Sequence, residues 1–317
     1  ASDWSSDVCS SDLAHACPRL NIHRHTPTPT PNTTLPTRIL PLAHPRATMR
    51  LMREPTNDEA IEEAAALLAR SRHVVALAGA GMSKESGIPT YRGEGGLWTR
   101  QGEPPRNLYQ QFLQQPAAWW HERLTEPPTE MAVALENARP NPGHLALVDL
   151  ERLGVLKHLI SQNVDNLHRR AGQRSLTEIH GNRQWLRCLM CGKRWPRLEF
   201  PIDEDALPPR CTEDGCEGIV KSDTVMFGEP IPPYHLRRCA EETWEADCFM
   251  TIGTSAVVYP AAQYPQEAAR RGIPVIEVNP EQTPLTDLAT IVIRLPSCEA
   301  LPRLVDAVRR RLDASAK

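Results

Sequence analysis

The sequence predicts an α/β fold with a parallel sheet and an inserted metal module. Three observations support this. From residue 56 onward short apolar runs recur along the chain, helical stretches lie between several of them, and four cysteines form two close pairs between residues 188 and 216. Such apolar runs are typical of strands buried on both faces. Their alternation with helices favours a parallel sheet that is covered on both sides.

The first expected element is a helix after Thr56, which has the spacing of a capping box with Glu59 and precedes apolar residues at helical spacing. A buried strand is expected next, at residues 74–78 (VVALA). Similar runs predict strands at residues 155–160, 248–252, 274–278 and 290–295, and helical patterns predict helices at 261–271 and about 299–312. In the last helix we interpret Arg309-Arg310-Arg311 as a solvated C-terminal turn that compensates the helix dipole, rather than as a nucleic-acid patch.

Residues 1–48 are expected to lie outside the fold, as a disordered leader. They hold seven of the 30 prolines and show no apolar period, so they cannot bury enough apolar surface to offset their ordering entropy. The opening ASDWSSDVCSSDL resembles translated sequencing-adapter read-through, which would make Met49 or Met52 the start of the chain. A transit peptide is the rival hypothesis. The folded domain is therefore expected at residues 49–317.

Composition excludes several classes of protein. The chain carries 36 Lys and Arg against 39 Asp and Glu, a net charge of −3, which does not favour a nucleic-acid partner. No run approaches the ~18 consecutive apolar residues of a membrane-spanning helix, so no membrane partner is expected. With nine cysteines, an odd number, in 317 residues, the chain is too long to be a small disulfide-stabilised scaffold.

A glycine loop, GAGMSKESG, follows the first strand. Gly79 and Gly81 let the backbone approach a pyrophosphate. The usual dinucleotide fingerprint has a third glycine where this chain has Lys84. It also has an acidic residue at the end of a second strand, and this chain shows no such strand after the glycine loop. A hydride-transferring dehydrogenase is therefore disfavoured. We expect a dinucleotide held under a long loop at residues 82–98, with Arg92 reaching a phosphate.

The two cysteine pairs predict a metal site. Their spacing is CxxC followed by CxxxxC, and two such knuckles suit one tetrahedral Zn²⁺ bound by four thiolates: Cys188, Cys191, Cys211 and Cys216. Because four sulfur ligands leave no open coordination position, the zinc is expected to be structural. An iron–sulfur centre is the alternative.

Polar residues recur where strands end. SQNVDNLH follows the strand at 155–160, EIHG ends in His180-Gly181, and GTS and VN follow two later strands. In a parallel sheet, ligands bind beyond the carboxyl ends of the strands. A histidine at such a position can act as a general base near neutral pH. The convergence of these polar groups on one edge predicts the site.

Taken together, the motifs GAGMSKESGIPTYRG, QNVDNLH, IHGN, CxxC/CxxxxC, MFGEP, IGTS and EVNP resemble the sirtuin family, in that family's order and over roughly residues 56–313. The resemblance implies an NAD-dependent protein lysine deacylase. It implies a Rossmann-like core at residues 56–98, 143–180 and 227–313, and a smaller domain. That domain would combine a helical insertion at about 99–142 with a zinc module at about 181–226.

The resemblance also implies the site residues. His180 would be the general base on a ribose hydroxyl, with Asn163 and Asp165 as further catalytic residues. The acyl-lysine oxygen would attack the ribose carbon as nicotinamide leaves, giving free lysine and O-acyl-ADP-ribose. The residues implied to hold NAD are Gly79, Ala80, Gly81, Ser83, Arg92, Trp98, Gln162, Asn163, Asp165, Gly253, Thr254, Ser255, Asn279 and Cys298. Those implied to bind the substrate backbone, as an added strand, are Val225, Phe227, Gly228 and Glu229.

The acyl group is less sharply indicated. Thr90-Tyr91-Arg92 resembles the sirtuin branch that removes acidic acyl groups, and that branch holds the acyl carboxylate with a Tyr and an Arg at i and i+3. In this chain Trp120 stands where that Tyr stands and Arg123 where the Arg stands. We therefore expect removal of succinyl or malonyl groups alongside some deacetylation. The alternative for both residues is ordinary helix packing, with Arg123 facing water.

Two other functions stay open at this point. One is an NAD-dependent ADP-ribosyltransferase, which shares the cofactor and the ribose chemistry. The other, a zinc-ribbon nucleic-acid binder, is disfavoured because the knuckles have few basic residues with interleaved aromatics. The expected partners are acylated lysine side chains of proteins. Free thiols and a thiolate zinc site favour the cytoplasm.

Overall fold

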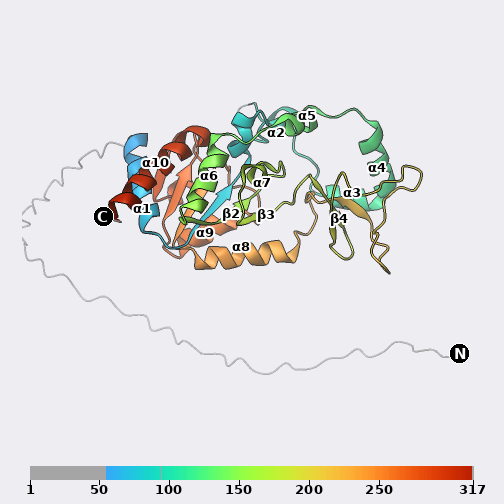
Figure 1. Cartoon of the computed structure of the whole chain (residues 1–317). Helices are drawn as coiled ribbons and strands as arrows, with labels where there is room; N and C mark the ends of the chain where they lie inside the picture. The colour runs from blue at the N-terminus through green and yellow to red at the C-terminus, as the bar shows by residue number, and fades with distance from the viewer. Residues whose placement is uncertain (1–54, 94, 316–317) are drawn as a thin grey trace, which may run out of the picture. The chain divides into compact units, whose positions relative to one another are not determined.

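The computed structural model describes residues 55–93 and 95–315. The predictions for the leader, including the starts at Met49 and Met52, lie outside the described residues. The described chain forms a large lobe around a six-stranded sheet and a small lobe around a three-stranded sheet (Figure 1). The predicted α/β fold class is confirmed.

The six-stranded sheet is parallel throughout, in the order β3-β2-β1-β7-β8-β9. Its strands are β1 (Val74–Ala78), β2 (Leu156–Ser161), β3 (Leu176–Glu178), β7 (Cys248–Ile252), β8 (Val275–Val278) and β9 (Ile291–Ile293). Five of them lie where the sequence predicts strands. Strand β3 was not predicted, because its three residues form no apolar run.

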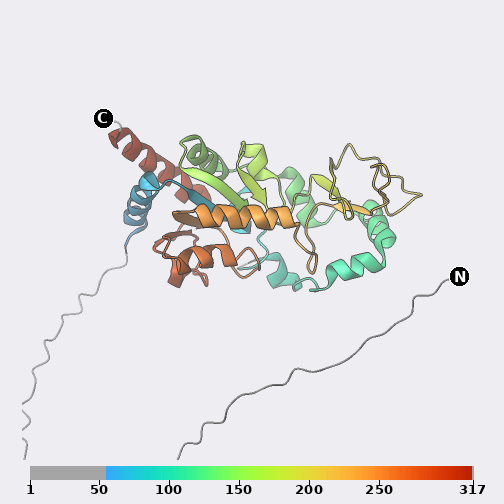
Figure 2. The same ribbon diagram turned by 90° about the horizontal axis from the view of Figure 1, so that it is seen from below.

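Both faces of this sheet are covered by helices. Alternate residues of β1 point to opposite sides, so that Ala76 packs with α1, α6 and α10, whereas Leu77 packs with α8 and α9. Figure 2, seen from below, shows α8 lying along the second face. The helices of the large lobe are α1 (Asn57–Arg70), α6 (Pro142–Arg152), α7 (Leu167–Ala171), α8 (Pro233–Glu245), α9 (Gln263–Arg270) and α10 (Ser297–Ser315), with 3-10 helices at Ala80–Ser86 and Thr286–Leu288.

The first helix begins as predicted. Thr56 accepts a hydrogen bond from the backbone of Glu59, whose side chain accepts one from the backbone of Thr56. The arginines of α10 differ from the prediction: the helix runs on to Ser315, so they do not form its last turn. They are held by neighbouring helices instead, Arg309 by Asp149 at 2.8 Å, and Arg310 and Arg311 by Glu62 at 2.6 and 3.0 Å. These ion pairs join α10 to α6 and α1.

The small lobe comprises four short helices and an antiparallel sheet in the order β5-β4-β6. Its elements are α2 (Leu97–Gln101), α3 (Leu108–Gln114), α4 (Pro116–Thr125), α5 (Glu130–Asn137), β4 (Trp185–Cys188), β5 (Arg194–Pro196) and β6 (Val220–Ser222). Its own core joins Trp120 of α4 to Leu186, Phe200 and Val220. Across the described residues, no helix combines the length and apolar character needed to span a bilayer.

Candidate active site and metal centre

A cavity of about 730 Å³ opens beyond the carboxyl ends of the parallel strands. The segments that follow β1, β2, β7 and β8 line it, as parallel sheets favour. The loop at residues 84–98 and the loop at residues 225–231 complete the wall. A space of this size suits a bound cofactor together with part of a substrate.

Most of the predicted NAD-binding residues line this cavity: Gly79, Ala80, Gly81, Arg92, Trp98, Gln162, Asn163, Gly253, Thr254, Ser255 and Asn279. The cavity also contains His180 and the four predicted substrate-binding residues Val225, Phe227, Gly228 and Glu229. Ser83 and Asp165 lie behind the wall, in contact with Asn163 or with each other. Cys298 is half-buried and does not line the cavity, although its neighbour Ser297 does.

The glycine loop is shaped by a contact between two loops as well as by any ligand. The backbone N–H of Gly81 donates to the carbonyl of Gly253 at 2.8 Å. A Cβ atom on Gly81 would lie 2.9 Å from that carbonyl oxygen, and one on Gly253 would lie 2.5 Å from the backbone nitrogen of Met82. The loop after β1 and the loop after β7 can therefore touch only through glycine. The sequence alone indicates only a pyrophosphate contact for Gly79 and Gly81.

We expect Gly253→Ala to destabilise the protein more than Gly154→Ala. Both glycines have positive φ, +54° and +72°, so both variants carry the backbone strain of about 1–2 kcal/mol for an L-residue. Only at Gly253 does the new methyl meet other atoms, which adds about 1–3 kcal/mol. Urea denaturation measures both losses. Equal losses would contradict the role given to the loop contact.

His180 presents one ring nitrogen to the cavity. Its Nδ1 lies 3.1 Å from the carbonyl oxygen of Gln162. Because a carbonyl only accepts, Nδ1 carries the proton and Nε2 is left as an acceptor in the neutral ring. Burial lowers the pKa of His180, and the hydrogen bond to Gln162 opposes this only partly. The ring is therefore neutral at pH 7 and ready to take a proton.

A chain of buried hydrogen bonds lies beside His180. Asn163 Nδ2 donates to Ser83 Oγ at 3.2 Å, and Ser83 Oγ donates to Asp165 Oδ2 at 2.6 Å. The other oxygen of Asp165 accepts the backbone N–H of Leu167 at 2.8 Å, at the start of α7. Asn163 is thus held in one orientation at the cavity wall.

The ends of three strands are linked across the cavity floor. Gln162, after β2, donates through Nε2 to Thr254 Oγ1 at 2.8 Å. Asn279, after β8, donates through Nδ2 to the carbonyl of Thr254 at 3.1 Å. These amides and hydroxyls form a ring of polar groups suited to ribose and phosphate oxygens.

Aromatic rings cover another side of the cavity. The Tyr91 ring packs against Trp98 at an interplanar angle of 34°, with ring centroids 4.5 Å apart, and the Trp98 and Phe227 centroids are 5.5 Å apart. The Arg92 guanidinium lies 4.6 Å from the Trp98 ring and forms an ion pair with Glu103 at 2.7 Å. Arg92, which the sequence predicts to bind a phosphate, therefore lies on the cavity wall and is paired with the carboxylate of Glu103.

Trp120 and Arg123 lie away from the cavity, contrary to the role that the sequence suggested for them. The Trp120 side chain is buried in the core of the small lobe, where its indole N–H donates to the carbonyl of Val220 at 3.0 Å. Arg123 is exposed, with its guanidinium 5.2 Å from the Trp119 ring. In this structure both residues follow the helix-packing alternative, because the bulky indole is taken up by the apolar core.

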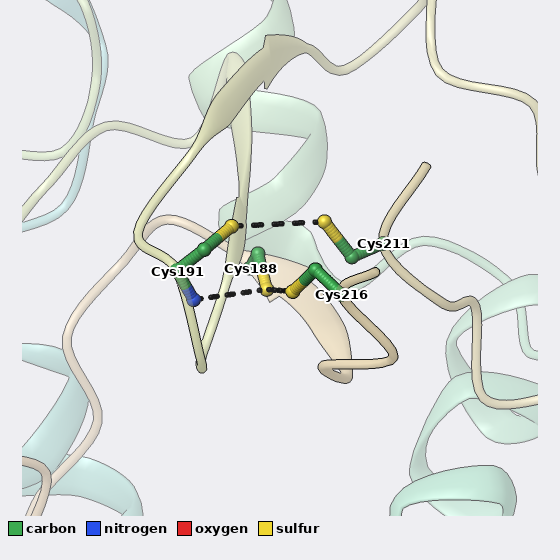
Figure 3. A group of neighbouring side chains, drawn as sticks. All are labelled: Cys188, Cys191, Cys211 and Cys216. Carbon is green, nitrogen blue, oxygen red and sulfur yellow. Dashed lines mark hydrogen bonds between the residues drawn. The ribbon is translucent and has the colours of Figure 1, made fainter. Parts of the chain in front are cut away.

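The four predicted zinc ligands come together in the small lobe (Figure 3). Their sulfur atoms all lie within 4.8 Å of one another, and the pairs Cys188–Cys216 and Cys191–Cys211 are 3.7 Å apart. Four thiolates at the usual Zn–S distance would be separated by about 3.8 Å in a tetrahedron. A Cβ on Gly218 would lie 2.5 Å from Cys188 Sγ, so a glycine is needed there for the knuckles to meet. The donor set and its spacing fit one structural Zn²⁺.

Sequence reasoning missed several cavity residues. The loops at residues 257–260 and 280–284 line the cavity, as do Lys84 and Glu85. The two loops belong to the segments after β7 (Cys248–Ile252) and after β8 (Val275–Val278), so their position beyond a parallel strand is the available signal. They were overlooked because they are apolar or rich in proline.

Comparison with known proteins agrees with this geometry. Residues 79–260 match the model of the Sir2 family. This match covers more than half of the chain. The chain belongs to the Sir2 family.

Individual Sir2 family members are similar over most of their length. The "NAD-dependent protein deacylase 2" of Pyrobaculum aerophilum is 43% identical over 248 residues, which are 78% of this chain and 95% of that protein. A solved Sir2 homologue in complex with NAD is 41% identical, with a TM-score of 0.64, covering 79% of this chain and 94% of that one. A Sir2 structure bound to a myristoylated histone peptide is 35% identical, with a TM-score of 0.59, covering 82% and 100%.

Proposed function

We propose that this Sir2 family chain removes acyl groups from protein lysines in an NAD-dependent reaction. The observation that carries the proposal is His180, a neutral histidine with a free acceptor nitrogen, placed in a cavity where the ends of the parallel strands converge. The NAD dependence and deacylase naming of its relatives support it.

The cavity residues fit NAD. The glycine loop brings backbone rather than side chains to the cavity wall, Arg92 supplies a cation for a diphosphate, and Asn279 and Thr254 offer groups for ribose hydroxyls. When bound, NAD would supply a ribose carbon activated by its nicotinamide leaving group. His180 Nε2 would be the group that accepts a proton from a ribose hydroxyl. The hydrogen bond from Nδ1 to Gln162 keeps the ring in the required tautomer.

Exclusion of water is the second task of this site, because water would otherwise compete for the activated ribose. The rings of Tyr91, Trp98 and Phe227 form an apolar cover on one side. Gly93 and Gly95 both have positive φ, which lets the loop that carries Tyr91 and Trp98 turn sharply. We assign this loop the role of a lid.

The substrate backbone is proposed to bind along residues 225–229 as an added strand. The Val225 N–H donates to the carbonyl of His180 at 2.8 Å, and the Tyr109 N–H donates to the carbonyl of Phe227 at 3.0 Å. These bonds fix the loop beside the base. We also propose the domain limits given above, with a catalytic domain at residues 49–317 and the zinc module as a structural part of it.

Turnover of a panel of acyl-lysine peptides with NAD tests this function. We expect nicotinamide release that depends on the acylated peptide, and mass spectrometry should show the peptide losing its acyl mass. Addition of an ADP-ribose mass to the protein target without loss of the acyl group would favour the ADP-ribosyltransferase alternative. Nicotinamide release that does not depend on the acyl group would contradict both.

The same panel tests a second candidate, the removal of acidic acyl groups. Its support is the sequence resemblance at Thr90-Tyr91-Arg92, whereas Arg123, with its guanidinium 5.2 Å from the Trp119 ring, lies outside the cavity in this structure. If succinyl-lysine reaches α4, Arg123→Met should lower kcat/KM for the succinyl peptide about tenfold or more, since a two-point Arg–carboxylate contact is lost, and leave the acetyl peptide unchanged. Arg100→Met, an exposed arginine of α2, is the matched control. Equal activity of Arg123→Met on both peptides would exclude the role.

A further inference from the structure

A completely buried lysine lies behind the proposed substrate loop. Lys221, on β6, has an exposed fraction of 0%. Its Nζ donates to the carbonyl of Ser222 at 2.7 Å and to that of Thr224 at 2.8 Å, and it lies 3.0 Å from Glu229 Oε2. All three donors of the ammonium are therefore used. Two of them go to the backbone that leads into the loop at residues 225–229.

Glu229 closes the other end of that loop. Its Oε2 accepts the backbone N–H of Met226 at 2.9 Å, and its Oε1 accepts Arg187 Nη2 at 2.6 Å. The side chain has an exposed fraction of 2%, although part of the residue lines the cavity. Lys221 and Glu229 thus hold the two ends of one short loop through a single ion pair.

A second buried acid connects the same network to His180. Asp223 accepts Arg187 Nε at 3.1 Å and Arg194 Nη2 at 2.7 Å. The backbone oxygen of Asp223 lies so close to Gly181 that a Cβ atom built on Gly181 would be 2.0 Å from that oxygen. Because Gly181 directly follows His180, the network lies behind both the base and the loop.

Replacing buried charges of this kind by apolar residues of similar volume is often neutral or stabilising, so stability alone does not account for this network. We propose that Lys221 is a positioning residue for the peptide substrate, which sets the backbone of residues 225–229 for strand addition. This inference rests on the proposed function. Lys221 touches neither substrate nor cofactor, and it acts through the backbone of Thr224 and through Glu229.

Steady-state kinetics on an acetyl-lysine peptide test the proposal with Lys221→Met and Lys221→Arg. We expect Lys221→Met to raise the KM for the peptide about tenfold or more, because a misplaced loop loses substrate contacts, while the KM for NAD stays within about twofold. Lys221→Arg keeps the cation and should recover most of the peptide affinity. Lys193→Met is the matched control, because it breaks an exposed ion pair with Glu213 in the same lobe and should leave both KM values unchanged.

The pH dependence gives an independent readout. Burial lowers the pKa of Lys221 to about 8, against the opposing effect of Glu229. Asp223 also favours the charged form, Arg187 disfavours it, and Tyr109 of α3 stays neutral because burial and the Glu229 charge raise its pKa. As the pH rises above 8 the ammonium loses its proton, so the peptide KM of the wild type should rise. In Lys221→Arg it should stay flat.

Three outcomes would overturn the inference. The first is an unchanged peptide KM in a Lys221→Met protein with full zinc content. The second is a fall in kcat alone. If Lys221→Met loses its zinc or fails to fold, Glu229→Gln is measured in its place. The third overturning outcome is an unchanged peptide KM in Glu229→Gln. A wild type without acyl-peptide turnover would instead contradict the proposed function.

Discussion

Replacing His180 by alanine is expected to lower acyl-lysine turnover by about 10²- to 10⁴-fold, the usual contribution of a general base. The variant should still bind NAD, because the glycine loop and the Gln162–Thr254 link do not depend on the ring. Single-turnover kinetics and NAD titration separate the two effects. His121→Ala is the control, since His121 is exposed on α4 and should have wild-type turnover.

The pH profile of the wild type should agree with this role. Burial places the pKa of His180 below the ordinary 6.5. The base is neutral above its pKa, so kcat/KM should be insensitive to this group at pH 7 and should fall as the pH drops below its pKa. Full turnover in His180→Ala, or an acid limb above pH 6.5, would contradict the assignment.

Loss of one zinc ligand should unfold the small-lobe sheet. We expect Cys188→Ser to release the metal and abolish turnover, because structural zinc contributes about 10–16 kcal/mol of binding free energy that is coupled to folding. Cys188 is fully buried at the end of β4, next to Arg187, which holds Glu229. Zinc analysis and limited proteolysis measure the effect. Cleavage should concentrate between residues 181 and 226.

The large lobe should survive this change. Its two apolar clusters contain no residue of β4, β5 or β6. Circular dichroism should therefore retain most of the helical signal. Cys239→Ala, which removes a buried thiol of the large lobe, should keep its zinc. Retained zinc and normal turnover in Cys188→Ser would contradict the predicted four-cysteine site.

Local patterns explain why much of the fold was predictable. The strands at residues 74–78 and 248–252 are buried along their whole length, so each reads as an apolar run without help from its neighbours. The zinc knuckles are equally local, because the spacing within each pair follows from one tight turn. Strand β3 could not be predicted in this way, because a strand of three residues is too short to show an apolar run.

The side-chain contacts that the sequence did not predict depend on distant segments. Trp120 has the helical spacing of a pocket residue, yet its position is decided by Val220, 100 residues away. Arg92 lies at the cavity as predicted, but its pairing with Glu103 depends on how the loop folds back. Neither contact has a signature in the residues around it.

By itself, the sequence determined the parallel sheet, the metal-binding cysteines and the set of polar residues at one sheet edge. Each of these follows from residues that are close in the chain. Only the tertiary structure decided that Gly81 must accommodate Gly253, that Glu229 turns inward to Lys221, and that Trp120 belongs to a core. Such choices arise when segments far apart in sequence compete for the same space, and a one-dimensional pattern does not contain that competition.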